Sequence, residues 1–300
     1  RDLVRSRGLG DVYKRQTQIM ASNIGGTATL IGDPPNIMIG SAAKLSFVDF
    51  ILNTGFAIVF VMIAALICFR FIYGNSLTVE DKNIKEVMKL DESKAIKSKK
   101  LLIQSVIILL IVALCFIFHD QLQMQSATIA LAAACLMLII GGQDPEDIIL
   151  SVEWPTILFF VGLFIVVGGL EKVGVITVLA NGLLSVTGGN ITMTMLLILW
   201  ISAIVSSFLD NIPFVATLIP MIMTIQSHGV DVTPLWWALS LGACLGGNGT
   251  LVGASANVVL SGISKNAGYP ITFGKYFKIG FPMMILSVFI CSVFLLIRFS

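Results

Sequence analysis

Charged residues are scarce in this chain: Lys, Arg, Asp and Glu together make up 12% of its 300 residues. Soluble domains carry about 25% charged residues, so the composition excludes an ordinary soluble domain. Hydrophobic residues reach 56%, mean hydropathy is +0.95, and several apolar runs approach the ~18 residues that span a bilayer. We therefore expect an all-α, polytopic, multi-pass integral membrane protein, in the plasma membrane or, for a prokaryote, the inner membrane.

The sequence also offers little to a catalytic or metal centre. Its only histidines, His119 and His228, are each isolated in a short connection, and its five cysteines lie in apolar runs without C-x-x-C spacing. Neither a disulfide nor a metal site is supported by that pattern. The "GGNG" motif is followed by no GK[ST], so it is not a phosphate loop. We expect no enzyme, catalytic residue, metal or cofactor, and the net charge of +2 does not suggest a nucleic-acid partner.

Hydropathy divides the rest of the chain into regular and interrupted apolar segments. Clear membrane spans are predicted at 54–73, 101–118, 126–142, 154–170, 191–209 and 278–298. The pieces at 17–42, 173–187, 212–226 and 235–262 are interrupted by Gly, Pro, Asn or Ser. Backbone broken at membrane depth must face protein or water, because lipid cannot pair its polar groups.

Two polar segments bound the predicted domains. Residues 1–16, "RDLVRSRGLGDVYKRQ", resemble a non-native tail such as translated adapter sequence, and we exclude them from fold reasoning. Residues 74–100 form a lysine-rich linker that the positive-inside rule places in the cytoplasm. This leaves 17–73 and 101–300 as two parts of one membrane domain.

The two parts contain an internal repeat. "GGTATLIGDPPN", which begins at Gly25, aligns without gaps on "GGNGTLVGASAN", which begins at Gly246, and the register continues to Lys44 and Lys265. The following segments "SFVDFILNTGF" and "TFGKYFKIGF" are also alike. Counting spans from the cytoplasmic linker makes the copies run in opposite directions if 173–187 does not cross. Inverted repeats with interrupted helices are typical of secondary transporters, whose site lies where the breaks meet. We expect the second repeat, 101–300, to be complete and the first, 17–73, to be partial.

Two intramembrane carboxylates are the candidate ion-binding groups. Asp210 and Asn211 precede Pro213 within "SSFLDNIPFVATLIP", which predicts a re-entrant hairpin or broken helix with Asp-Asn at its tip. Asp33 precedes Pro34 and Pro35, which forbid helical continuation and free nearby carbonyls. The alternatives are that Asp210 ends a helix at the interface and that Asp33 caps a turn. The full set of candidate substrate- or ion-binding residues is Asn23, Thr27, Thr29, Asp33, Asn36, Asp210, Asn211, Asn248, Thr250, Ser255 and Asn257; the residues predicted to break the backbone are Gly25, Gly26, Gly32, Pro34, Pro35, Pro213, Gly246, Gly247, Gly249 and Gly253.

At these motifs the chain resembles the ion transporter superfamily, in particular the citrate-transporter-like permeases. That group includes arsenite permeases, Na⁺/H⁺ antiporters and P-protein-like permeases, and "NIGGTATLIGDPPN", "FLDNIPFVATLIP" and "LGACLGGNGTLVGASANVV" carry the similarity over about 17–300. Related dicarboxylate symporters hold substrate and Na⁺ at Ser-Asn-Thr tips. Here the tip reads Asp210-Asn211-Ile212, and its carboxylate would repel an anion unless it is protonated or paired with a cation.

The resemblance implies a secondary active transporter for an organic or inorganic anion, coupled to Na⁺ or H⁺. The alternatives are an arsenite or antimonite efflux permease, a Na⁺/H⁺ antiporter and, as a different class, an ion channel. Family members have a further hairpin and scaffold spans before "NIGG", so we expect a chain truncated at its N-terminus that would not transport alone. Its expected partners are the lipid bilayer, a small ionic substrate and a second copy of the chain.

Overall fold

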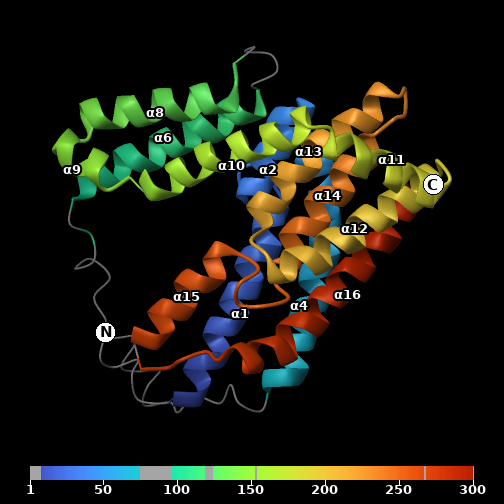
Figure 1. The fold of residues 1–300 in the computed structure, drawn as a ribbon. Helices are drawn as coiled ribbons and strands as arrows, with labels where there is room; N and C mark the ends of the chain where they lie inside the picture. Colours follow the sequence, from blue (N-terminus) through green and yellow to red (C-terminus); the bar gives the residue numbers. More distant parts are fainter. Residues whose placement is uncertain are drawn as a thin grey trace. The chain divides into compact units, whose positions relative to one another are not determined.

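The computed structural model describes residues 8–74, 96, 98–118, 124–152, 154–266 and 268–299, with side chains outside 8–14 and 156, and it contains helices and no strands within these residues (Figure 1). Of the tail 1–16, residues 8–16 form the first turns of α1, although they were excluded from fold reasoning, and of the linker only 74, 96 and 98–100 are among the described residues. Each clear span predicted from hydropathy is confirmed as helical. The elements are α1 (Gly8–Thr27), α2 (Pro34–Ala43), α3 (Phe47–Phe50), the π-helical turn η2 (Ile51–Gly55), α4 (Phe56–Tyr73), α6 (Lys99–Ile117), α8 (Ser126–Ile140), α9 (Pro145–Leu150), α10 (Trp154–Lys172), α11 (Val175–Thr187), α12 (Ile191–Phe208), α13 (Asn211–Ser227), α14 (Thr233–Gly246), α15 (Ser255–Asn266) and α16 (Phe273–Phe299).

The helices have the length and apolarity of a multi-pass membrane protein. Four of the described helical segments can cross a bilayer: Phe47–Tyr73, Lys99–Ile117, Ile191–Phe208 and Phe273–Phe299. A fifth span is reached if α10 and α11, which are bent by 69° at a short break, count as one. The prediction of an all-helical, polytopic membrane protein is thereby confirmed.

The chain packs as two compact units. One contains residues 1–45, 49–78 and 162–300; the other contains residues 46–48 and 79–161, with α6, α8 and α9. Within the smaller unit α6 packs on α8, and the Trp154 indole donates a hydrogen bond to the carbonyl of Ile149 (3.1 Å). This division follows packing and cuts across the sequence repeat, so the domain boundaries taken from the repeat stay a prediction. All candidate site residues lie in the larger unit.

Helix α14 is the core of the larger unit. It packs against α1, α2, α12, α13 and α16, and every residue from Pro234 to Gly246 is buried. Small residues let α12 approach it closely: a Cβ added at Gly242 or Gly246 would lie 2.5 Å or 2.6 Å from a backbone carbonyl oxygen of α12. This is the small-residue packing by which membrane helices associate without a hydrophobic drive between them.

The two helix breaks have the same local structure. Helix α1 ends just before residues 28–33 and α14 just before residues 247–254, and each second half-helix begins at the same position of the repeat, Pro34 or Ser255. In each break the aligned glycines, Gly26 with Gly32 and Gly247 with Gly253, lie backbone against backbone. At Gly32 an added Cβ would lie only 2.2 Å from the Gly26 carbonyl oxygen. The glycines therefore fold each break into a tight loop, as their predicted role requires.

A 27-residue helix follows each break. The first, Phe47–Tyr73, contains the π-helical turn η2, whereas the second, Phe273–Phe299, is α-helical throughout. Within η2 the buried Thr54 hydroxyl lies near the carbonyls of Phe50 (2.8 Å) and Ala28 (3.2 Å). The first break is thereby tied to the helix that follows it.

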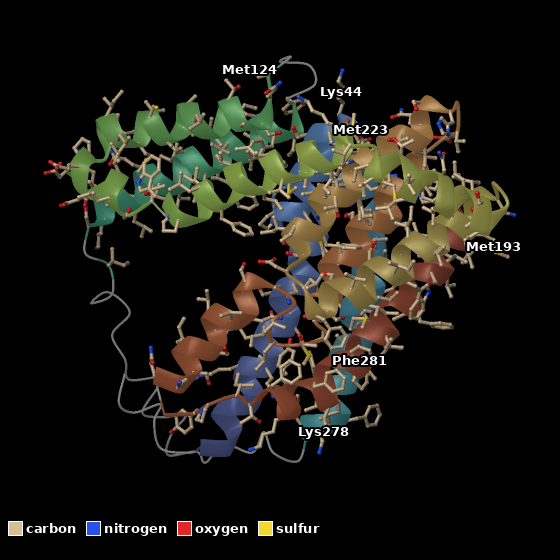
Figure 2. The ribbon with its side chains drawn as sticks, viewed as in Figure 1. Lys44, Met124, Met193, Met223, Lys278 and Phe281 are labelled. Atoms are coloured by element: carbon tan, nitrogen blue, oxygen red, sulfur yellow. The ribbon has the colours of Figure 1, made fainter. Side chains whose placement is uncertain are left out.

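Helices α1 and α14 approach their breaks from opposite directions within the larger unit (Figure 1). Figure 2 shows Lys44, which ends α2, and Lys278, in the first turns of α16, toward opposite ends of this unit. The opposite orientation of the two repeat copies stays a prediction.

Candidate functional site

Asp33 and Asn211 meet where the first break faces the turn between α12 and α13. The Asn211 amide nitrogen lies 3.5 Å and 3.4 Å from the two carboxylate oxygens of Asp33. These long distances leave the carboxylate loosely held. Asp33 is partly exposed, whereas Asn211 is buried.

Local sequence explains why the carboxylates lie there. Asp33 has extended backbone (φ −143°, ψ 138°) and precedes Pro34 and Pro35, which begin α2. Asp210 stands at the same N-cap position before α13, and its side chain accepts a 3.4 Å hydrogen bond from the Ile212 N–H. The sequence predicted the Asp-Asn tip between two helices, and the structure has it there.

The electrostatics of this cluster favour a bound cation. Asp33 and Asp210 stand at the N-caps of α2 and α13, and these two helices pack against each other. Two carboxylates near one another relieve their repulsion by binding a proton or a metal cation between them. We call Asp33, Asp210 and Asn211 the carboxylate cluster.

Asn36 lies beside this cluster but its amide is used within the protein. Its Nδ2 donates to the carbonyls of Thr27 (3.2 Å) and Thr29 (3.0 Å), which the helix break leaves free. Its Oδ1 accepts from the hydroxyl of Ser240 (2.6 Å) and the thiol of Cys244 (3.4 Å) on α14. The side chain is completely buried, so the structure places Asn36 as a bridge between the first break and α14.

Asn257 occupies the matching position in the second break. Its Nδ2 donates to the carbonyls of Gly247 (2.6 Å) and Thr250 (2.9 Å), and its Oδ1 accepts from Asn23 on α1 (2.9 Å). Asn23 also donates to Asn248 (2.9 Å). Three predicted site residues, Asn23, Asn248 and Asn257, are thereby brought together in one buried amide cluster, separate in its contacts from the carboxylate cluster.

The remaining predicted ligands are divided between these surroundings. Thr27 and Thr250 are fully buried, and their hydroxyls donate to the backbone carbonyls of Asn23 and Ser207. Thr29 is partly buried in the first break, and Ser255 is exposed at the start of α15. Whether any of these side chains binds a solute stays a prediction.

Two side chains that support the site were not predicted from the sequence. Ser240 and Cys244 belong to an apolar run and were not among the predicted site residues, yet both donate to Asn36. A signal was available: Ser240, Cys244 and Asn248 recur at every fourth position, which places them on one face of a helix.

The sequence model of the citrate transporter family matches residues 16–242. An uncharacterized transporter of Mycobacterium bovis is 42% identical over 285 residues, which cover 94% of this chain and 66% of that protein. A transporter of Synechocystis is 32% identical, with 92% of this chain and 66% of the relative covered. The P protein of Sus scrofa is 31% identical, with 93% and 43% covered. This chain thus spans about two thirds of the length of the bacterial relatives and less of the P protein.

Proposed function

We propose that this chain, which belongs to the citrate transporter family, serves in a secondary active transporter that moves a small organic or inorganic anion together with Na⁺ or H⁺. The coupling ion binds at the carboxylate cluster, with Asp33 as its principal ligand. The observation that carries the proposal is the partly exposed residue Asp33, whose carboxylate makes long contacts to Asn211 at the point where a broken helix faces a helix–turn–helix tip.

We also propose that the two breaks belong to an inverted repeat. Asn23 of the first copy contacts Asn257 of the second, and Cys244 of the second contacts Asn36 of the first. In the repeat alignment Asn23 stands at the position of Cys244, and Asn36 at that of Asn257. A two-fold relation between the copies predicts such reciprocal contacts. If position i of the first copy contacts position j of the second, then position j of the first copy contacts position i of the second. These contacts support opposite orientations of the two copies.

The carboxylates favour a coupled carrier over the alternatives. An arsenite or antimonite permease carries a neutral solute and has no need of two carboxylates, and a channel needs a continuous polar path. Asp33 and Asp210 suit a carrier in which a cation binds and neutralises the carboxylates, either before the anion binds or together with it. A Na⁺/H⁺ antiporter uses the same groups without an anion. The transport measurements described next distinguish it from a coupled anion carrier.

The protein expressed from its complete gene is reconstituted into proteoliposomes, and uptake of radiolabelled citrate and of arsenite is measured with Na⁺ and pH gradients imposed one at a time. We expect one gradient to drive citrate uptake. Asp33→Asn keeps the shape of the side chain and removes its charge. The rate of gradient-driven uptake should therefore fall at least tenfold, which corresponds to a loss of about 1.4 kcal/mol in the free energy of ion binding.

Asp231→Asn is the matched control, because Asp231 is an exposed aspartate in the loop before α14 and lies outside the carboxylate cluster. It should leave uptake unchanged. Uptake of citrate that ignores both gradients would contradict the coupled-carrier proposal. Arsenite uptake without citrate uptake would favour the permease, and Na⁺/H⁺ exchange without either solute would favour the antiporter.

A further inference from the structure

We infer that Asn36 and Asn257 are positioning residues, which we call the two latches. Through its hydrogen bonds each one holds its own helix break closed and connects that break to the other copy of the repeat. Both were predicted as ligands of the transported solute. The inference concerns how the breaks are built, and it stands whichever solute or coupling ion the protein carries.

A side-chain amide has two N–H donors and a carbonyl oxygen with two lone pairs. At Asn36 all four positions are occupied by Thr27, Thr29, Ser240 and Cys244. A solute could be bound only after one of these hydrogen bonds is broken. In a fully buried site the group left behind would be unsatisfied, which is unfavourable.

The Asn257 amide is used in the same way. Both of its N–H groups go to carbonyls of its own break, Gly247 and Thr250, and its oxygen accepts from Asn23. The Thr29 and Thr250 carbonyls are aligned positions of the repeat, so one of the two carbonyls that each asparagine holds is equivalent in the two copies. Thus each asparagine satisfies carbonyls that the interrupted helix leaves without an intrahelical partner.

Each latch also reaches across to the other copy. The donors to Asn36 come from α14, and the donor to Asn257 comes from α1. Because α1 leads into the first break and α14 into the second, each break rests on the helix that enters the other. Opening either break therefore removes support from its counterpart, and the two breaks should loosen together.

Cys244 is a native reporter of this opening. It is completely buried, it donates to Asn36, and it lies three residues before the Gly247 carbonyl that Asn257 holds. Loss of either latch should expose its thiol. Cys291, which is also completely buried but belongs to the middle of α16, reports general loss of structure instead.

The test uses the protein from its complete gene in two backgrounds, one retaining only Cys244 and one only Cys291, purified in detergent without Na⁺ or carboxylate solutes. Labelling by N-ethylmaleimide is timed. Asn36→Ala and Asn257→Ala should each accelerate Cys244 labelling about tenfold or more, because unsatisfied buried groups raise the open population. Labelling of Cys291 should stay at the parent rate.

Asn190→Ala is the matched control, since the Asn190 side chain also holds backbone: at the exposed start of α12 its Oδ1 accepts a 3.0 Å hydrogen bond from the Met193 N–H. It should leave both rates unchanged. If an alanine variant at a latch fails to fold, two milder variants should still accelerate Cys244 labelling: Ser240→Ala, which removes one donor to Asn36, and Asn23→Ala, which removes the donors to Asn257 and Asn248. Parent-rate labelling of Cys244 in the latch and donor variants would overturn the inference, as would equal acceleration of Cys291.

Discussion

The two helix breaks share the residues that shape them and differ in the residues that could meet a solute. Asn36 and Asn257 donate to the carbonyls of the aligned threonines Thr29 and Thr250, and the aligned glycines lie backbone against backbone in both copies. Where the first copy has Asp33-Pro34-Pro35, the second has Ala254-Ser255-Ala256. Prolines have no N–H to donate, so the start of α2 presents a carboxylate in place of free donors. At the scale of single residues, common positions build the fold and divergent positions carry the charge.

The glycine pair of the first break gives a direct test of its tight geometry. In Gly32→Ala the new Cβ would lie 2.2 Å from the Gly26 carbonyl oxygen, a distance that forces the backbone to move. We expect the free energy of unfolding to fall by about 1–3 kcal/mol, the usual cost of overpacking. Thermal or denaturant unfolding in detergent measures it.

Gly25→Ala is the control for that variant. Gly25 lies in the same stretch, but among the described residues no atom beyond its own helix turn lies within 4 Å of an added Cβ. Because alanine is the better helix former, this variant should be as stable as the parent or slightly more so. Equal destabilisation by both substitutions would show that the close contact does not hold the break.

At the scale of elements, the π-helical turn η2 explains a one-residue difference between the copies. The segment "SFVDFILNTGF" has one residue more than "TFGKYFKIGF", and the first copy alone has a π-turn in the helix that follows the break. A π-turn closes i→i+5 hydrogen bonds and so takes up an additional residue. The faces of α3 and α4 thus stay in register despite the extra residue.

Deleting Leu52 should convert this turn to α-helix while keeping the helix faces on both sides. Leu52 is 46% exposed, so little packing is lost, and we expect the melting temperature to shift by less than about 4 °C. Deleting Ile63, which is 50% exposed in the regular part of the helix, should instead rotate the following residues by about 100° and prevent folding. Monodispersity and thermal melting distinguish the two; equal tolerance of both deletions would contradict this role of η2.

Elements were easier to predict from sequence than contacts between them. Apolar length and the Gly, Pro and Asn interruptions predicted the helices and both breaks, because span length and broken backbone are local properties. The partners of Asn36 were not predicted, since Ser240 is more than 200 residues away and appears in an apolar run. The prediction that buried asparagines are ligands rested on their polarity; only the fold shows which carbonyls lie within their reach.

At the scale of the larger unit, two copies of one motif support each other around α14, while one carboxylate lies in the first copy and the other in the turn between α12 and α13. Reciprocal contacts between Asn23 and Asn257 and between Cys244 and Asn36 join the copies, and α14 packs against the helices of both. Our proposals therefore separate two tasks in this protein: the amides position the breaks, and Asp33 with the Asp210-Asn211 tip is proposed to bind the coupling ion.

Solute counterflow in proteoliposomes tests this separation most directly. Vesicles loaded with unlabelled citrate and containing the parent protein or Asp33→Asn are diluted into labelled citrate, first without a gradient and then with the driving Na⁺ or pH gradient. We predict that Asp33→Asn still exchanges citrate without a gradient but no longer accumulates it when the gradient is imposed. Gradient-driven accumulation by Asp33→Asn at the parent level would contradict the assignment of the coupling ion to Asp33.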